Sequence, residues 1–365
     1  MVARRRILSV VGTRPNFMKI APIARALAAR PTEFEHVLVH TGQHYDDAMS
    51  AIFFGELGLQ PPDVFLGVGS GTRTEQTVRV MTALEPVLRD GRPDVVLVPG
   101  DVTSTLAAAL TAHDVGVTLG HVEAGLRSFD RTMPEELNRV ITDQLSDILL
   151  IHSPEAREHL LAEGRPANAI HMVGNTMIDT LVAMRELIDA RDTSARHGLA
   201  PGGYVLVTLH RPALVDGPLL QDALAALALL SEAYEVVFPV HPRTRKRISA
   251  IGAGPLPERV RLLEPLGYLD FLALTRDAAA VLTDSGGVQE ETTYLGVRCF
   301  TLRDNTERPI TLELGTNTLL GLDPSRIAEI PTLLSADGRG PSSVPPYWDG
   351  RAAERIVPLL AATPA

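Results

Sequence analysis

Short apolar runs alternate along the chain with longer stretches in which apolar and charged positions recur at helical spacing. The apolar runs are rich in β-branched residues, as strands are, and lie at 6–11, 36–40, 94–98, 115–119, 148–151, 169–173, 204–209, 235–240, 260–263, 279–282 and 297–302. The helical patterns between them include 21–29, 104–112, 136–145 and 218–231. This alternation predicts βαβ units, and strands that are apolar throughout predict parallel sheets covered by helices on both faces.

The length of the chain predicts more than one domain. A chain of 365 residues exceeds what a single hydrophobic core usually organises. The polar segment 191–203 has no apolar period and is the expected linker. We therefore predict an α/β protein with two doubly wound, Rossmann-like domains at 1–190 and 204–347, followed by a helical segment at 348–365.

Composition and charge narrow the possible partners. The chain has 34 basic and 44 acidic residues, a net charge of −10, which argues against a nucleic-acid partner. The single cysteine, Cys299, excludes a disulfide framework and a cysteine-ligated zinc. The apolar run after Arg6 is too short for a signal peptide, and no stretch approaches the roughly 20 apolar residues of a membrane span. We expect a cytoplasmic protein without a membrane partner.

Polar residues and glycines concentrate where the predicted strands end. These ends read Gly12-Thr13-Arg14-Pro15, His40-Thr41-Gly42-Gln43, Gly100-Asp101, Gly120-His121-Val122-Glu123, His210-Arg211, His241-Pro242 and Asp284-Ser285-Gly286-Gly287. In open α/β sheets, ligands bind beyond the carboxyl ends of the strands. The pattern therefore predicts a cleft lined by both domains.

Three groups suit a phosphorylated ligand. Ser285-Gly286-Gly287 follows a strand and precedes a helical stretch at 288–295, so backbone N–H groups can face an anion. Arg14, expected on a tight turn, could bridge phosphate oxygens, and His241 and Arg243 could add donors. The alternative is that the two glycines form only a strand-to-helix turn.

A nicotinamide cofactor is not expected. The run Gly67-Val68-Gly69-Ser70-Gly71 resembles a dinucleotide fingerprint, but Thr72 stands where the third glycine belongs.

Two adjacent carboxylates, Glu290 and Glu291, follow the glycines of the 285–287 turn. They suit the hydroxyls of a ribose as well as a solvated helix face.

Asp101, Glu123 and Glu135 form a second candidate group, with His210 in the other domain. Together they offer the acids and bases that proton transfer at a sugar carbon requires. Asp101 could instead cap a helix from Thr103, Glu135 could only complement a helix dipole, and the spacing does not exclude a glycosidase pair. No histidine spacing is typical of metal ligands, so no metal is expected.

Taken together, the motifs resemble the non-hydrolysing UDP-N-acetylglucosamine 2-epimerases, which have the glycosyltransferase-B architecture. The matching segments span nearly the whole chain: 12–22, 41–44, 99–101, 120–127, 134–139, 173–175, 208–211, 284–291 and 306–309. The resemblance implies inversion at C2 of the sugar by elimination of UDP, a glycal intermediate and re-addition of UDP, with no cofactor. It also implies a homodimer and a C-terminal helix that crosses back onto the first domain.

The resemblance also implies roles for residues. The expected catalytic set is Asp101, Glu123, Glu135 and His210. The expected groups around UDP are Arg14, His241, Ser285, Gly286, Gly287 and Glu291, with Phe271 near the uracil and Lys19 supporting the first loop. Which carboxylate acts as base and which as acid stays open.

One segment departs from the family pattern. Many bacterial members have His-Arg-Arg-Glu-Asn where this chain has Pro212 and Ala213 after His210-Arg211. That neighbourhood helps those members to bind a second substrate molecule as an activator. Gln43 and His241 remain, but we expect no such activation here. A variant UDP-sugar, a hydrolysing epimerase, a glycosyltransferase and a degenerate nucleotide-sugar sensor stay as alternatives.

Overall fold

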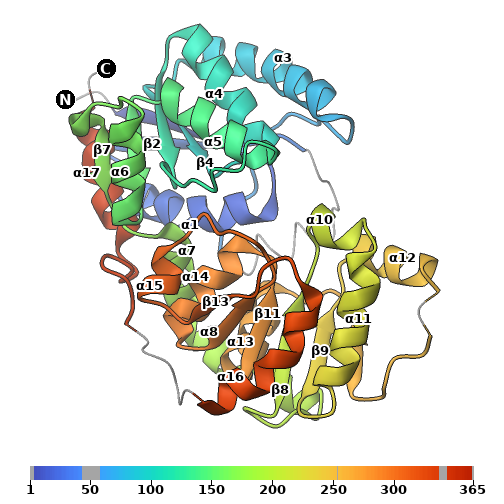
Figure 1. The fold of residues 1–365 in the computed structure, drawn as a ribbon. Coiled ribbons are helices and arrows are strands. Elements are labelled where there is room, and N and C mark those ends of the chain that lie inside the picture. Colours follow the sequence, from blue (N-terminus) through green and yellow to red (C-terminus); the bar gives the residue numbers. More distant parts are fainter. Residues whose placement is uncertain (1–3, 43–57, 253, 337–342, 364–365) are drawn as a thin grey trace. The chain divides into compact units, whose positions relative to one another are not determined.

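A computed structural model describes residues 4–42, 58–252, 254–336 and 343–363. The chain divides into two compact units, Met1–Ala183 with Pro346–Ala365 and Met184–Pro345. Each unit is an α/β sandwich around its own parallel sheet (Figure 1).

Within the described residues, the first unit has a seven-stranded sheet in the order β3-β2-β1-β4-β5-β6-β7. Its strands are β1 (Arg5–Val11), β2 (Phe34–His40), β3 (Val64–Phe65), β4 (Val95–Pro99), β5 (Thr118–Val122), β6 (Ile148–Ile151) and β7 (Ile170–Met172). Its helices are α1 (Arg14–Ala28), α3 (Arg73–Gly91), α4 (Thr103–Val115), α5 (Pro134–Leu145), α6 (Pro154–Ala162), α7 (Thr176–Ala183) and α17 (Ala352–Ala362). The strand order reverses between β1 and β4, which is where open α/β sheets bind ligands.

Helices cover both faces of this sheet. α3, α4 and α5 pack beside one another in one layer, while α1 packs against α7 and α17 (Figure 1). Between the sheet and the first layer, Val96 and Val98 of β4 are buried in one cluster with Leu84 and Leu88 of α3. Strands that are buried on both faces explain why their apolar runs are continuous.

Within the described residues, the second unit has a six-stranded sheet in the order β10-β9-β8-β11-β12-β13. Its strands are β8 (Tyr204–Thr208), β9 (Glu235–Pro239), β10 (Val260–Leu263), β11 (Ala280–Thr283), β12 (Arg298–Thr301) and β13 (Asn317–Leu319). Its helices are α8 (Arg185–Asp189), α9 (Thr193–Arg196), α10 (Pro212–Val215), α11 (Leu219–Leu230), α12 (Pro242–Ala250), α13 (Tyr268–Asp277), α14 (Gly286–Leu295), α15 (Ile310–Glu313) and α16 (Ile330–Ala336). The two sheets confirm the predicted fold class.

Several predicted boundaries were wrong. The alternation did not reveal β3 or β13, which are two and three residues long. Helix α4 continues to Val115 and ends at Gly116 in the left-handed conformation (φ 79°), so β5 begins at Thr118 and not at 115. Helix α1 begins at Arg14, which places Arg14 in a first helical turn and not on the expected tight turn.

The segment 191–203, expected as a linker, packs on the second unit. Thr193 and Ser194 donate hydrogen bonds to Asp270 and Asp277 at 2.6 and 2.7 Å, and Leu199 is buried in the core beneath α13. Its polar side chains satisfy partners on α13, which a search for apolar periodicity cannot detect. The boundary between the two compact units falls earlier, at Ala183 and Met184.

The C-terminal segment belongs to the first unit. Helix α17 packs on α1 and α7, and the Asp179 carboxylate accepts hydrogen bonds from the N–H groups of Ala352 and Ala353 at 3.0 and 2.8 Å. Just before this helix, Trp348 is fully buried and its indole N–H donates to the His152 carbonyl at 2.9 Å.

Two further findings bear on the sequence predictions. Among the helices that the structure describes, none has the length and apolarity needed to cross a membrane. Gln43, the expected remnant of an activator site, lies outside the described residues.

Candidate active site

Two of the expected catalytic carboxylates follow neighbouring parallel strands of the first unit. Asp101 comes after β4, and Glu123 comes directly after β5. Gly100 turns the chain before Asp101 with φ 67°, and Glu123 itself has φ 71°. A left-handed conformation is costly for a side chain like glutamate, and such strain is concentrated at functional sites. The backbone is therefore bent here so that both carboxylates leave the same edge of the sheet.

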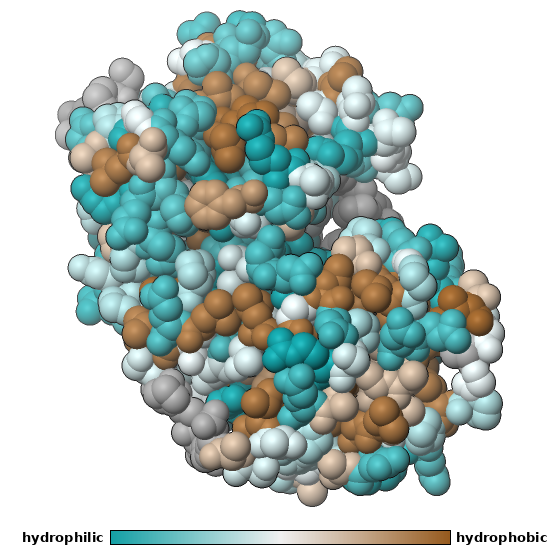
Figure 2. All heavy atoms as spheres, viewed as in Figure 1, coloured by the Kyte–Doolittle hydropathy of each residue, from teal (hydrophilic) through white to brown (hydrophobic). Residues whose placement is uncertain are grey.

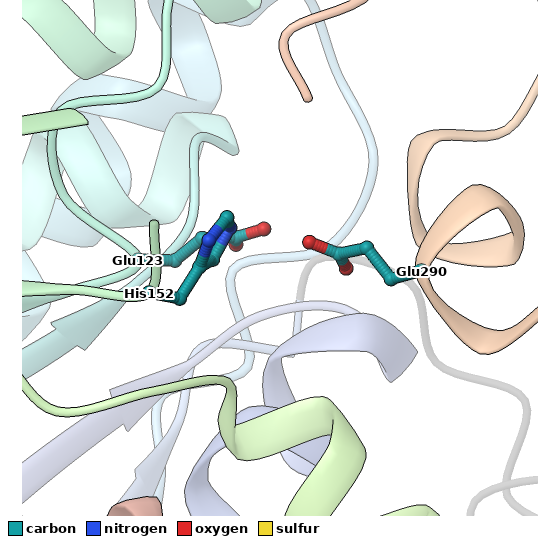
Figure 3. A group of neighbouring side chains, drawn as sticks. All are labelled: Glu123, His152 and Glu290. Atoms are coloured by element: carbon teal, nitrogen blue, oxygen red, sulfur yellow. The ribbon is translucent and has the colours of Figure 1, made fainter. Parts of the chain in front are cut away.

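Glu123 is buried and paired with Lys19 of α1. Both side chains are 7% exposed, and the ammonium contacts the carboxylate. His152, at the end of β6, lies beside Glu123, and both line one small pocket of this unit (Figure 3). The resemblance implied that Lys19 supports the first loop, and in the structure its ammonium pairs with Glu123.

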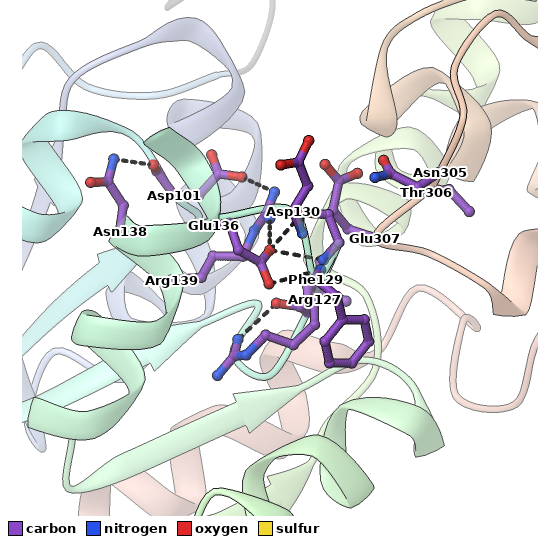
Figure 4. A network of polar contacts seen from close by, with 12 residues as sticks. Asp101, Arg127, Phe129, Asp130, Glu136, Asn138, Arg139, Asn305, Thr306 and Glu307 are labelled. Atoms are coloured by element: carbon purple, nitrogen blue, oxygen red, sulfur yellow. Dashed lines mark hydrogen bonds and ion pairs between the residues drawn. The ribbon is translucent and has the colours of Figure 1, made fainter. Parts of the chain in front are cut away.

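Asp101 is held by a cation from α5. The Arg139 guanidinium is 3% exposed and pairs with the Asp101 carboxylate, while the Asn138 amide donates to the Asp101 carbonyl at 2.7 Å (Figure 4). Arg139 also contacts Glu136 at 3.1 Å, and Glu136 accepts the backbone N–H of Ser128 at 2.8 Å. The N-cap position of α4 is Val102, so the alternative that Asp101 caps this helix was wrong.

Glu135 and Arg14 each stand in the first turn of a helix. As expected from the sequence, Glu135 follows Pro134 at the start of α5, and its side chain is half-buried. Arg14 is exposed at the first position of α1. The start of α1 is tied to β4, because the Asn16 amide donates to the Pro99 carbonyl at 3.0 Å and its oxygen accepts the N–H of Gly12 at 3.1 Å.

In the second unit, His210 is held by a buried carboxylate. Asp284 is 1% exposed, and its two oxygens lie 3.0 Å from His210 Nδ1 and 2.8 Å from the backbone nitrogens of His210 and Arg211. Burial tends to raise the pKa of the Asp284 carboxyl, but these contacts hold it below its usual value. An ionised Asp284 orients the imidazole through Nδ1, and 47% of the His210 side chain stays exposed.

The turn after β11 forms the N-terminus of α14. Ser285 is the N-cap residue, and Gly286 and Gly287 open the helix. A Cβ atom at Gly286 would lie 2.3 Å from a guanidinium nitrogen of Arg308, so a larger residue there would have to displace that side chain. The free N–H groups of a first helical turn can bind an anion, which is the role that the sequence predicted for this turn.

Glu291 lies one turn further along α14 and is buried. Burial raises the pKa of the Glu291 carboxyl to about 8, against a hydrogen bond from Tyr268, and the charge of Glu290 adds to the rise. Glu290 itself pairs with Arg308 at 2.9 Å. Both glutamates therefore point into the protein, and the alternative of a solvated helix face was wrong for them.

His241 and Phe271 occupy different surroundings. His241 is exposed at the N-cap of α12, where its Nδ1 accepts the Arg243 N–H at 3.2 Å. Phe271, on α13, is half-buried and packs against the core cluster that contains Leu274 and Val288.

The structure thus groups the expected residues by unit. Arg14, Lys19, Asp101, Glu123 and Glu135 lie in the first, and His210, His241, Phe271, Ser285, Gly286, Gly287 and Glu291 lie in the second.

Sequence reasoning missed the residues that hold these groups, chiefly Arg139, Asp284 and Arg308. Arg139 is four positions after Glu135 on α5, a spacing that places both on one helix face. This spacing was the available signal.

Comparison with known proteins decides the family. The profile described as UDP-N-acetylglucosamine 2-epimerase matches residues 25–361. A protein of that name from Methanocaldococcus jannaschii is 40% identical over 360 residues, which cover 96% of this chain and 97% of the relative. The chain belongs to the UDP-N-acetylglucosamine 2-epimerase family.

The fold agrees with this family. The crystal structure of the Methanocaldococcus jannaschii UDP-GlcNAc 2-epimerase in complex with UDP-GlcNAc and UDP has a TM-score of 0.87 at 39% identity, covering 97% of this chain and 99% of that one. The chain has the two Rossmann-like domains of the glycosyltransferase-B architecture.

Relatives of this chain are named for more than one UDP-sugar. A relative from Pseudomonas aeruginosa, UDP-2,3-diacetamido-2,3-dideoxy-D-glucuronate 2-epimerase, is 39% identical over 366 residues, which cover 98% of this chain and 99% of the relative. Membership of the family therefore leaves the substituents of the sugar undecided.

Proposed function

We propose that this chain interconverts UDP-N-acetylglucosamine and UDP-N-acetylmannosamine without hydrolysis and without a cofactor. The observation that carries the proposal is the pair of cation-held carboxylates, Asp101 and Glu123, at neighbouring strand ends of a 2-epimerase family member. Inversion at one carbon requires proton removal on one face and proton delivery on the other, which two carboxylates can perform.

The C2 proton of the sugar is not acidic, because no carbonyl is adjacent to C2. In the proposed route a carboxylate takes this proton, the C2–H electron pair forms the C1–C2 double bond, and the C1–O bond breaks. UDP leaves with that bonding pair. A proton then reaches C2 on the opposite face and the UDP oxygen rejoins C1, so atoms and electrons balance. Asp101, Glu123 and Glu135 are the candidates for these proton transfers.

UDP must stay bound while it is cleaved from the sugar. The N-terminus of α14 at Ser285, Gly286 and Gly287 offers N–H groups to the phosphates, and the imidazole that Asp284 orients offers a further donor. Glu291 is proposed to accept hydroxyl hydrogens of the ribose. The remaining groups proposed to contact or support UDP are Arg14, Lys19, His241 and Phe271.

A variant UDP-sugar is the second candidate substrate. The Pseudomonas aeruginosa relative supports it, since that protein is named for a 2,3-diacetamido glucuronate. The chain also has its own sequence after His210-Arg211, where Pro212 starts the short helix α10. The same elimination chemistry applies to either sugar, because it involves only C1, C2 and UDP.

Proton NMR in deuterium oxide tests the activity. Incubation with UDP-N-acetylglucosamine is expected to yield the manno epimer and to place deuterium at C2 of both epimers. Free N-acetylmannosamine in place of the UDP-linked epimer would identify a hydrolysing enzyme. Binding without turnover, or transfer to an acceptor with C2 unchanged, would overturn the proposal. A parallel incubation with the diacetamido glucuronate decides between the two substrates.

Asp101→Asn is expected to lower the rate of epimerisation about 10²- to 10⁴-fold if this carboxylate transfers a proton. The matched control is Asp114→Asn on α4, since Asp114 is exposed in the same unit. Initial rates with the same UDP-sugar provide the comparison. An unchanged rate for Asp101→Asn removes Asp101 from the catalytic set.

The segment after His210-Arg211, which differs from the family pattern, bears on activation by substrate. Because Pro212 and Ala213 replace an arginine and a glutamate of many bacterial members, we propose that substrate does not activate this enzyme. The expected result is a hyperbolic dependence of rate on UDP-N-acetylglucosamine concentration, and a sigmoidal dependence contradicts it.

We also propose a homodimer. Apolar side chains gather on the outer surface over α4 and α5 of the first unit (Figure 2), where Leu106, Leu110, Leu137 and Val140 are half-buried and Ile141 is exposed. Contiguous exposed apolar surface is typical of interfaces. Sedimentation analysis is expected to find a dimer that Ile141→Glu weakens, and a monomeric wild-type protein contradicts the proposal.

A further inference from the structure

His121 lies in β5, two residues before Glu123, and is fully buried. Its Nδ1 is 2.6 Å from the Asp143 carboxylate and its Nε2 is 2.8 Å from the Gly100 carbonyl oxygen. A carbonyl oxygen only accepts hydrogen bonds, so Nε2 must carry a proton. The charge of the ring then depends on Asp143.

Asp143, on α5, is fully buried and accepts from several donors. Arg127 contacts one of its oxygens at 2.7 Å, and the Gly125 N–H donates to the same oxygen at 3.1 Å. The Arg127 guanidinium is always charged and the Gly125 N–H can only donate, so both contacts favour the ionised form of Asp143 independently of His121. Asp143 is therefore an ionised acceptor, and Nδ1 of His121 must donate to it.

We propose that His121 is a buried imidazolium, protonated on both nitrogens, that positions the two turns carrying Asp101 and Glu123. Its role in the reaction rests on the proposed function, whereas its charge does not. His121 touches no reacting atom, so it is a positioning residue.

The geometry explains how one ring can position both turns. Nε2 holds the carbonyl of Gly100, the residue before Asp101. Nδ1 holds Asp143, which also binds the N–H of Gly125, two residues after Glu123. The same ring thus connects the β4 turn, the β5 turn and helix α5. A neutral ring would keep only one of its two hydrogen bonds, and the lone pair of its unprotonated nitrogen would face an acceptor oxygen.

The surrounding charges are balanced. Arg127 carries one positive charge, and it pairs with Asp143 and with Glu163 of the segment after α6 at 2.6 Å. The Lys19 ammonium and the Glu123 carboxylate also lie close to Gly100. With His121 protonated, three cations (His121, Arg127 and Lys19) face three anions (Asp143, Glu163 and Glu123), so this group carries no net charge.

Neutron diffraction from perdeuterated wild-type crystals at about pH 8 tests the charge without any variant. At that pH an ordinary histidine is neutral. We expect deuterium on both nitrogens of His121. Deuterium on a single nitrogen of His121 overturns the proposal, whatever the activity of the enzyme.

Kinetics test the positioning role. His121→Gln keeps a donor but cannot be a cation that bridges both partners, so we expect kcat to fall about 10- to 100-fold with KM changed less than about twofold. The control is His113→Gln on α4, which is expected to keep wild-type values. Circular dichroism establishes that each variant is folded. Wild-type kcat in folded His121→Gln overturns the role.

A second variant covers the case in which His121→Gln does not fold. Asp143→Asn keeps the size of the side chain but removes the charge that requires Nδ1 to be protonated, and the same fall in kcat at nearly constant KM is expected. Unchanged kcat in this variant contradicts the proposal. A wild-type protein that turns over no UDP-sugar instead overturns the proposed function, while the neutron result still decides the charge of His121.

Discussion

At the scale of single residues, the candidate site consists of acids that each pair with a particular neighbour. Lys19 pairs with Glu123, Arg139 pairs with Asp101, and His210 faces Asp284. Glu291 differs from these acids, because burial dominates and raises its pKa to about 8. Pairing and burial therefore place the carboxylates of the candidate site in different surroundings.

The raised pKa of Glu291 predicts a dependence of stability on pH. The folded carboxyl keeps its proton up to about pH 8, whereas the unfolded one loses it near 4.5. Between these values the folded state binds more protons, so the free energy of unfolding falls as pH rises through that window. Urea unfolding is expected to show this fall, on the order of a few kcal/mol, in wild type and not in Glu291→Gln.

The matched control for Glu291→Gln is Glu232→Gln, since Glu232 is exposed in the same unit. This control is expected to keep the slope of the wild type. Equal slopes for wild type and Glu291→Gln contradict a raised pKa at Glu291.

At the scale of elements, α5 organises the first unit's half of the site. Its first turn carries Glu135, Arg139 holds Asp101, and Asp143 holds His121 and the Gly125 N–H. These positions are four residues apart, so they lie along one face of the helix. One helix thereby carries Glu135 and holds the two turns, after β4 and β5, that carry Asp101 and Glu123.

Arg139→Lys tests the role of this helix. A lysine ammonium lacks the planar fork with which Arg139 contacts both Asp101 and Glu136, so Asp101 is expected to lose its orientation. We expect kcat for epimerisation to fall about 10- to 100-fold with little change in KM. The control is Arg89→Lys, in which an exposed pair with Glu85 is altered. Activity equal to wild type means that Arg139 does not position Asp101.

At the scale of the whole molecule, the chain ends in the unit where it began. Segment 346–363 packs on the first unit, and Trp348 anchors it against His152 at the end of β6. The two rings are perpendicular with centroids 5.8 Å apart. The C-terminal residues therefore stabilise a strand end next to Glu123.

Trp348 is the only tryptophan, and its replacement tests this anchoring. Trp348→Ala is expected to cost about 3–5 kcal/mol of the free energy of unfolding, because it leaves a large cavity. Trp348→Phe keeps most of the ring and loses the hydrogen bond to the His152 carbonyl, at a cost of about 1 kcal/mol plus some packing. Urea unfolding followed by circular dichroism measures both, and a Trp348→Ala variant as stable as wild type contradicts the anchoring.

The sequence by itself determined the fold class, the family and most of the acids at the strand ends. The alternation of strands and helices follows from the local spacing of apolar residues, and the motifs are runs of neighbouring residues. Both signals are local in the sequence, so they can be recognised without the tertiary structure. Boundaries were less accurate, because they depend on caps such as Gly116 and on packing, as the segment 191–203 illustrates.

Only the tertiary structure decided how the acids are held. Arg139 meets Asp101 across 38 positions of sequence, and Lys19 meets Glu123 across 104. The charge of His121 likewise depends on Gly100 and Asp143, which approach the ring from two other elements. Pairing and burial are properties of packed surfaces, and those surfaces exist only once the sheet and its helices have assembled.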